Sequence, residues 1–263
     1  MTKNKKVEER LLRKEKQYDI ERRMRKKRSE EYEVLEEVFD KPTLMTIYHL
    51  MNTEIVQKIY GVVNSGKESR IYCGIAPNNR EVALKIYLVV SAEFKKGMLA
   101  YIQGDPRFKR IRRDTKSLIY AWALREYKNL QKAFASGVRV PKPIAVRNNV
   151  LVMEFVGENG VSAPLLREVQ LENPNEVYQG LLEVMKTLYQ RANLIHGDFS
   201  EYNIMVWKGE LVLFDVSQAV PLEHPLAEQL LRRDIGNLNY YFEKMGAQVN
   251  TTEDAYRWVT QSD

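Results

Sequence analysis

Residues 194–215 read Leu-Ile-His-Gly-Asp-Phe-Ser-Glu-Tyr-Asn-Ile-Met-Val-Trp-Lys-Gly-Glu-Leu-Val-Leu-Phe-Asp. His196 stands two residues before Asp198, Asn203 follows Asp198 by five, and Asp215 closes an apolar run. Asp and Asn are common loop residues, so the evidence is their order and spacing between apolar runs. This pattern indicates phosphoryl transfer, with Asp198 orienting the attacking hydroxyl and with Asn203 and Asp215 holding Mg²⁺ on the phosphates.

Length and composition limit the class of protein. The chain has 263 residues, 44% of them hydrophobic, which suffices for one two-lobed domain or two small ones. Cys73 is the only cysteine, which excludes an internal disulfide and a cysteine-based zinc cluster. No apolar run approaches the length of a membrane span, and the N-terminus lacks the apolar core of a signal peptide. We therefore expect a soluble, cytoplasmic protein with no membrane partner.

The positive charge is concentrated at the N-terminus. Residues 1–30 contain 13 Lys or Arg and 6 Asp or Glu, a net charge of +7, whereas the whole chain carries +6. Residues 1–40 lack the apolar stripe of a well-buried helix, so we expect a basic helical arm. The cluster at 22–28 would suit contact with nucleic acid phosphates, and a solvated helix without a partner fits equally well.

Residues 54–90 have the pattern of an antiparallel sheet. Strands are predicted at 55–63, 69–75 and 81–87, separated by turns at 64–68 and 77–79. Lys85, in the last of these strands, follows Ala83 and Leu84 as a phosphate-binding lysine does.

The turn at 64–68 needs a separate test because residues 61–67 fit the start of a P-loop, Gly-x-x-x-x-Gly-Lys. Glu68 replaces the Ser or Thr that a P-loop needs, and a strand, not a helix, is predicted to follow. We therefore interpret the segment as a hairpin turn that covers phosphates, with Ser65 and Lys67 as candidate contacts.

A second basic segment lies at about 89–116 and holds eight Lys or Arg residues. The sequence Gly-Asp-Pro at 104–106 interrupts it. A mobile insertion that contacts RNA or a protein substrate and a solvated loop without a partner are both consistent with this composition.

Helical patterns dominate the remaining chain. Residues 115–135 have helical periodicity, with an apolar face that includes Leu124, and carry Glu126, which could pair with Lys85. A hairpin turning at 148–149 follows, and the end of its second strand (150–156), from Met153 to Val156, would form a hinge. Helices are predicted at 175–191 and 226–245. Asp234, in the last helix, fits an ion pair with a neighbouring arginine better than a bracing contact to the catalytic loop.

Strands first and helices later, with the catalytic stretch between them, predict an α+β, two-lobed, protein-kinase-like fold. We expect a basic arm at 1–40, an N-lobe at 41–157, a C-lobe at 158–250 and a polar tail at 251–263.

The sequence resembles the RIO family of atypical serine/threonine protein kinases, in the branch usually numbered one. The resemblance covers about residues 50–247. The segments that carry it are 64–69, 82–87, 101–108, 150–155, 196–205 and 215–220.

This resemblance implies a compact kinase without the usual activation loop, dependent on ATP and Mg²⁺. It implies that Lys85, positioned by Glu126, neutralises phosphates and that backbone groups of Glu154 and Val156 bind adenine. It further implies a role in maturation of the small ribosomal subunit, with precursor rRNA and proteins as partners of a monomeric enzyme. In this family the metal-binding aspartate, here Asp215, can itself accept the phosphoryl group.

Three positions depart from the family pattern. Asn64 and Ser69 replace the first and last residues of the usual phosphate-loop sequence, and both are small enough for a turn. Ser217 replaces a glycine two places after Asp215, which puts the flexibility of that loop in doubt.

Two other functions fit the same motif. Aminoglycoside and choline kinases share His-Gly-Asp-x-x-x-x-Asn, but they usually carry a large substrate subdomain, and only 48 residues follow Asp215 here. An RNA-associated assembly factor that uses ATP as a switch would explain the basic arm and insertion.

Overall fold

The computed structural model describes residues 38–88, 98–99, 101–102, 104–105, 107, 112 and 114–261. Nearly all of the predicted basic arm and most of the basic insertion lie outside these residues. The chain divides into two compact units, residues 1–48 and 49–263. Helix α2 (Lys41–Asn52) spans the boundary between the units.

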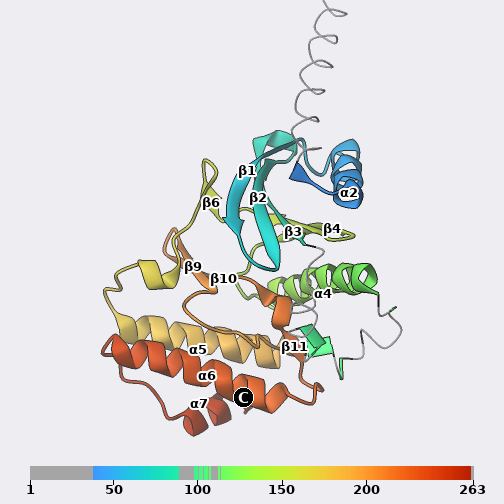
Figure 1. Ribbon diagram of the computed structural model, residues 1–263. Coiled ribbons are helices and arrows are strands. Elements are labelled where there is room, and N and C mark those ends of the chain that lie inside the picture. The colour runs from blue at the N-terminus through green and yellow to red at the C-terminus, as the bar shows by residue number, and fades with distance from the viewer. Residues whose placement is uncertain are drawn as a thin grey trace, which may run out of the picture. The chain divides into compact units, whose positions relative to one another are not determined.

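The second unit contains a five-stranded antiparallel sheet (Figure 1). Its strands, in spatial order, are β1 (Lys58–Ser65), β2 (Ser69–Ile75), β3 (Glu81–Tyr87), β5 (Val150–Glu154) and β4 (Pro143–Arg147). The predicted bounds of β2 and β3 are confirmed. The predicted start of the first strand at Ile55 is wrong, because the N–H groups of Ile55 and Val56 donate to the Leu50 carbonyl and close the preceding helix.

Helix α4 (Thr115–Ala135) packs against β4 and β5. Asp114 caps its N-terminus by accepting a hydrogen bond from the Ser117 N–H, at 2.9 Å. The predicted apolar face is partly wrong, since Leu124 is 42% exposed. In its place the helix buries three polar side chains, Arg125, Glu126 and Asn129. Because buried polar groups require partners, this face of α4 serves a polar site as well as the core.

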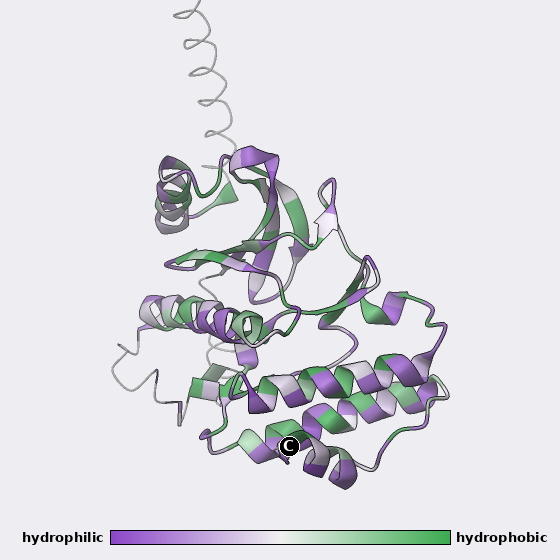
Figure 2. Cartoon of the chain, turned by 180° about the vertical axis from the view of Figure 1, so that it is seen from behind, coloured by the Kyte–Doolittle hydropathy of each residue, from purple (hydrophilic) through white to green (hydrophobic). Residues whose placement is uncertain are grey.

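The rest of the unit is mainly helical (Figure 1). Its long helices α5 (Pro174–Gln190) and α6 (Ala227–Lys244) show alternating hydrophobic and hydrophilic residues, as Figure 2 makes visible. Two short hairpins complete it, β6 (Gly157–Glu158) with β7 (Val161–Ser162) and β9 (Ile204–Trp207) with β10 (Glu210–Leu213). A separate antiparallel pair, β8 (Leu194–Ile195) with β11 (Val220–Pro221), joins two segments that lie on either side of the β9–β10 hairpin in the sequence.

The prediction of a polar tail at 251–263 is wrong for most of that segment. Residues Thr252–Thr260 form helix α7, capped by Thr251, and it packs against α5 and α6. Ala255 and Val259 are fully buried in the same apolar cluster as α5 and α6. These two apolar residues are enough to bury one side of α7, because they lie four positions apart and therefore share one face of the helix.

One continuous apolar cluster joins the sheet to the helices. It includes Cys73 and Ala83 from the sheet, Leu182 from α5 and Phe242 from α6. Among the described residues, no helix is both long and apolar enough to cross a membrane. The architecture is α+β with a sheet part and a helical part, as predicted.

Candidate active site

A cleft of about 440 Å³ lies between the sheet and the helical part. Lys85 and Met153 line it from the sheet, and Asn203 and Asp215 line it from the hairpin formed by β9 and β10. Its volume falls in the range of small-molecule sites. The cleft therefore brings together two parts of the sequence that were predicted separately to bind a nucleotide.

Lys85 is the centre of the polar contacts in this cleft. Its Nζ donates to Glu126 Oε1 at 2.8 Å and to Asp215 Oδ1 at 2.8 Å. Tyr87, also on β3, donates from its hydroxyl to the other oxygen of Glu126. Position 85 lies inside β3 and is paired with β2 on one side and β5 on the other, so the lysine is buried. The predicted pair of Lys85 and Glu126 is thus formed, and Asp215 joins it.

The charges of these three groups determine one another. Burial alone would lower the pKa of Lys85, but the carboxylates of Asp215 and Glu126 outweigh this effect and raise its pKa. Burial would raise the pKa of Asp215, and Lys85 outweighs it, so that the pKa of Asp215 is lowered. Burial raises the pKa of Glu126 above its ordinary value although Lys85 opposes it. Asp215 is therefore an anion at neutral pH, beside a charged lysine.

The loop between β8 and β9 holds Asp198 next to Asn203. The Asn203 Nδ2 donates to the Asp198 carbonyl at 2.8 Å and to its Oδ2 at 3.1 Å. Because the amide nitrogen is used in this way, the amide oxygen of Asn203 is the atom suited to a metal ion. Burial raises the pKa of Asp198, while His196 and Asn203 oppose the rise.

His196 supports the loop as a buried, neutral ring. Its Nδ1 accepts from the Asp198 N–H at 3.2 Å, and its Nε2 lies 3.2 Å from the Phe214 carbonyl, to which the neutral tautomer donates. Burial lowers the pKa of His196, which is consistent with this assignment. His196 therefore connects the backbone of Asp198 to that of Phe214, the residue before Asp215.

Asp234 braces the catalytic loop, and the preference for an ion pair with a neighbouring arginine is wrong. Its two carboxylate oxygens accept from the N–H groups of Gly197, at 2.7 Å, and Phe199, at 3.0 Å. Arg232 instead contacts Glu228 and Glu253. Gly197 has φ +76°, and a Cβ there would lie 3.1 Å from the Gln218 carbonyl oxygen, so the close approach of the loop favours glycine.

The phosphate-covering turn is confirmed as a hairpin, since β2 starts at Ser69 and no helix follows Gly66. Of its residues, Asn64, Gly66 and Ser69 line the cleft. The predicted contacts Ser65 and Lys67 belong to the same turn but are not among the lining residues. Ser65 alternates with Asn64 along β1 and so faces the other side of the strand.

Glu68, in the same turn, was not predicted as a site residue. Burial and then the charge of Asp215 raise the pKa of Glu68, so its carboxyl lies within electrostatic range of Asp215. In the sequence, Glu68 is notable only because it stands where a P-loop needs Ser or Thr. That position does not indicate that Glu68 lies near Asp215.

The hinge residues Glu154 and Val156 line the cleft, but parts of each are already bonded. The Glu154 N–H donates to Lys142, and the Val156 carbonyl accepts from Ala163. An adenine edge would therefore have to meet the Glu154 carbonyl and the Val156 N–H.

The Glu154 side chain has a partner outside the cleft. Its carboxylate accepts from both Nη atoms of Arg139, at 2.8 and 2.9 Å, and Arg139 Nε also contacts Glu210 of β10 at 3.1 Å. The Arg139 carbonyl accepts from the Leu213 N–H of the same strand. Arg139 therefore connects the hinge to the hairpin that carries Asn203.

Two lining residues at the mouth of the cleft escaped the sequence analysis. The Arg167 guanidinium lies 4.8 Å from the centre of the Tyr202 ring, which is 54% exposed. Tyr202 directly precedes Asn203, and that position is the one signal that could have identified it. No motif surrounds Arg167.

Comparison with known proteins agrees with this geometry. The protein-family model described as the RIO domain matches residues 70–255 of this chain. The chain belongs to the RIO family of serine/threonine protein kinases. It is 42% identical over 248 residues to the RIO-type serine/threonine-protein kinase Rio1 of Haloferax volcanii, covering 94% of this chain and 84% of that protein. The corresponding kinase of Methanocaldococcus jannaschii is 39% identical, with 88% and 78% covered.

A solved RIO kinase has the same fold. The crystal structure of the Rio2 kinase–ADP/Mg²⁺–phosphoaspartate complex from Chaetomium thermophilum superposes with a TM-score of 0.64 at 23% identity, covering 84% of this chain and 67% of that one. The two-lobed kinase-like prediction is thereby confirmed. In this RIO domain η4 (Val216–Gln218), β11 and α6 follow Asp215 directly, so the described chain passes to the last long helix without an activation loop.

Proposed function

We propose that this RIO kinase binds ATP with Mg²⁺ in the cleft and uses Asp198 and Asp215 for phosphoryl transfer. The observation that carries the proposal is the convergence of Lys85, Glu126 and Asp215 within hydrogen-bonding distance, together with the bonded pair of Asp198 and Asn203. Lys85 supplies positive charge for the phosphates, and Asp198 orients the attacking oxygen. Family membership favours this function over a small-molecule phosphotransferase.

The residues present suit Mg²⁺. Among the described residues, no group of three or more His, Cys, Asp or Glu side chains is placed so that it could hold a metal ion. Mg²⁺ does not require one, because it is usually bound by one or two carboxylates together with phosphates and water. Asp215 and the amide oxygen of Asn203 would hold the ion, which when bound neutralises charge on the phosphates.

We further propose that Asp215 accepts the γ-phosphoryl group in part of the turnover. A carboxylate oxygen forms a bond to the γ-phosphorus while the bond from that phosphorus to the bridging oxygen breaks, and ADP leaves with the electron pair. Attack by water on the acyl phosphate then returns the carboxylate and releases phosphate. The low pKa of Asp215 supports this role, because a nucleophilic carboxylate must be ionised.

Labelled ATP distinguishes a phosphoryl group bound to a carboxylate from one bound to a hydroxyl group. With Mg²⁺ and ATP labelled in the γ-phosphate, the wild-type chain should form ADP and acquire label that hydroxylamine removes, because hydroxylamine cleaves acyl phosphates. Omission of Mg²⁺ serves as the control and should prevent both. Label that resists hydroxylamine would indicate a phosphorylated hydroxyl and would contradict the acyl phosphate.

We also propose a role in maturation of the small ribosomal subunit, with ATP hydrolysis releasing a monomeric, cytoplasmic enzyme. The net charge of +7 in residues 1–30 supports it, because Lys and Arg bind RNA phosphates by releasing counterions. In sedimentation of cell extract with ATP, Asp215→Ala should remain with the small subunit while the wild type leaves it. Equal release of both proteins would contradict a switch driven by hydrolysis.

A further inference from the structure

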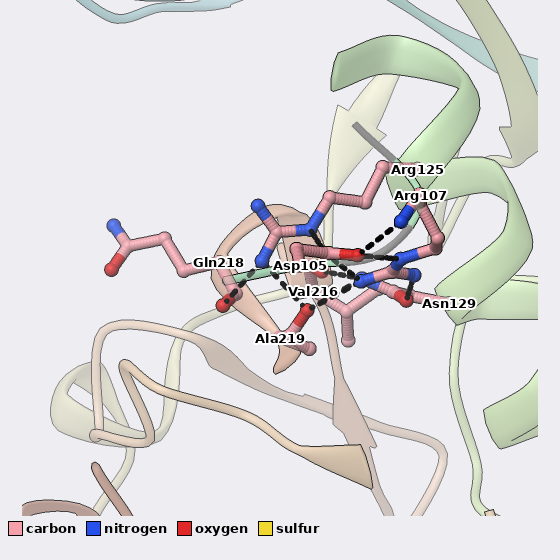
Figure 3. A network of polar contacts seen from close by, with 7 residues as sticks. All are labelled: Asp105, Arg107, Arg125, Asn129, Val216, Gln218 and Ala219. Carbon is pink, nitrogen blue, oxygen red and sulfur yellow. Dashed lines mark hydrogen bonds and ion pairs between the residues drawn. The ribbon is translucent and has the colours of Figure 1, made fainter. Parts of the chain in front are cut away.

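A buried polar cluster joins α4 to the segment that follows Asp215 (Figure 3). Asn129 Nδ2 donates to the carbonyls of Val216, at 2.9 Å, and Ala219, at 3.1 Å. Arg125 Nη2 donates to the carbonyls of Gln218, at 3.1 Å, and Ala219, at 2.9 Å. Both side chains are at most 2% exposed and lie four residues apart on one face of α4. Helix α4 therefore binds the backbone of residues 216–219 through two side chains.

Asp105 and Arg107 complete the cluster from another part of the chain. Arg107 Nη1 donates to Asn129 Oδ1 at 2.7 Å, and its Nε and Nη2 donate to the Asp105 carboxylate. Asp105 Oδ2 also lies 3.6 Å from Arg125 Nε. Asp105 thus bridges two guanidinium groups, and Figure 3 shows all four side chains turned toward one another. Both residues were counted in a basic, mobile insertion, but here Asp105 is buried and Arg107 points inward.

The segment held in this way, residues 216–219, directly follows Asp215. The backbone of Asp215 itself is strained. Asp215 has φ 54° and ψ 58°, the left-handed conformation. This conformation is unfavourable for a non-glycine residue and persists only where the surroundings enforce it. The carbonyls of Val216, Gln218 and Ala219 are the nearest fixed points on its C-terminal side.

The same helix also reaches Asp215 from the other direction. Glu126 lies beside Arg125 in α4 and binds Lys85, which binds Asp215. Helix α4 is therefore connected to Asp215 twice, once through Lys85 and once through the backbone that follows. Removal of either connection leaves the carboxylate attached at one side alone.

We propose that Asp105, Arg107, Arg125 and Asn129 are positioning residues that hold Asp215 in the orientation in which it receives Mg²⁺. The inference rests on the proposed function, in which the cleft binds a nucleotide and Mg²⁺. It adds four residues that would contact neither the nucleotide nor the metal ion. Groups that orient a metal ligand typically change metal affinity by about 10–100-fold when they are replaced.

The test measures ADP affinity with and without Mg²⁺ in the full-length chain. Asn129→Asp keeps an oxygen for Arg107 but places an acceptor against the carbonyls of Val216 and Ala219. We expect the Mg²⁺-dependent gain in ADP affinity to fall by about 10-fold or more, while ADP affinity without Mg²⁺ is unchanged. Arg107→Gln, at a partly exposed side chain, should lower the gain in the same direction with little effect on folding.

Asn239→Asp is the matched control. Asn239 is a buried asparagine of α6 that accepts from the Tyr178 hydroxyl at 2.9 Å and donates to the Asn250 carbonyl at 2.8 Å, remote in sequence from the site. It should lose stability as Asn129→Asp does and keep the full Mg²⁺-dependent gain. A wild-type gain in both Asn129→Asp and Arg107→Gln would overturn this inference alone. A wild-type chain without any gain would overturn the proposed function and this inference with it.

Discussion

Replacement of Asp215 with asparagine should reduce Mg²⁺-dependent ADP formation by at least about 10²–10³-fold, as the loss of a group that stabilises transition-state charge does. Asparagine has nearly the same shape but no negative charge, so it neither attracts Mg²⁺ strongly nor attacks phosphorus. Lys85 would keep Glu126 as its partner, at 2.8 Å, and would remain buried and charged. The hydroxylamine-sensitive label should disappear, as a gel assay with γ-labelled ATP would show.

Asp254→Asn is a suitable control for this experiment. Asp254 is an exposed carboxylate in the first turn of α7 and accepts from Thr251. Its replacement should leave ADP formation and labelling unchanged. If Asp215→Asn still acquired hydroxylamine-sensitive label, another carboxylate would be the acceptor, and Asp215 would be a metal ligand at most.

The second large effect is expected at Asp198. Asp198→Asn should lower transfer to a hydroxyl acceptor by about 10²–10⁴-fold, the usual contribution of a general base. Nucleotide affinity should be unchanged, because the contacts of Lys85 and Asp215 do not involve the Asp198 side chain. Phosphorylation kinetics at saturating ATP, together with a separate measurement of ADP binding, would distinguish the loss of chemistry from the loss of binding.

The pH dependence gives an independent check on Asp198. Its pKa is raised by burial, and the carboxylate must be deprotonated to accept a proton. Activity should therefore fall, as the pH is lowered, at a higher pH than the ordinary aspartate pKa of 3.8 would give. Asp198→Asn should retain no such fall. An identical acidic limb in the variant would assign the titration to another group.

Most elements of the fold could be predicted because their signals are local. Residues 77–79 mark a turn between two β-strands, and Gly137, with φ +88°, follows the end of α4. The catalytic stretch was predictable for the same reason, since Asp198 and Asn203 lie on one short loop. Lys85 and Glu126 needed only the assumption that a nucleotide site brings a strand and a helix together.

What could not be predicted depends on backbone partners far away in the sequence. Asp234 resembled half of a surface ion pair, because its partners are the N–H groups of Gly197 and Phe199, which no side-chain pattern records. Asp105 and Arg107 resembled a solvated loop, because the carbonyls and side chains that enclose them come from α4 and from residues 216–219. Burial of charge is a tertiary property, whereas composition reports only that charges are present.

Arg139 has a consequence for how the two lobes move. It joins the hinge carboxylate of Glu154 to Glu210 on the β9–β10 hairpin, and all three side chains are partly exposed, at 29%, 34% and 63%. Exposed ion pairs of this kind contribute about 1 kcal/mol or less and weaken as salt is added. We therefore expect added salt to weaken the link between the hinge and the β9–β10 hairpin and so to ease the opening of the cleft.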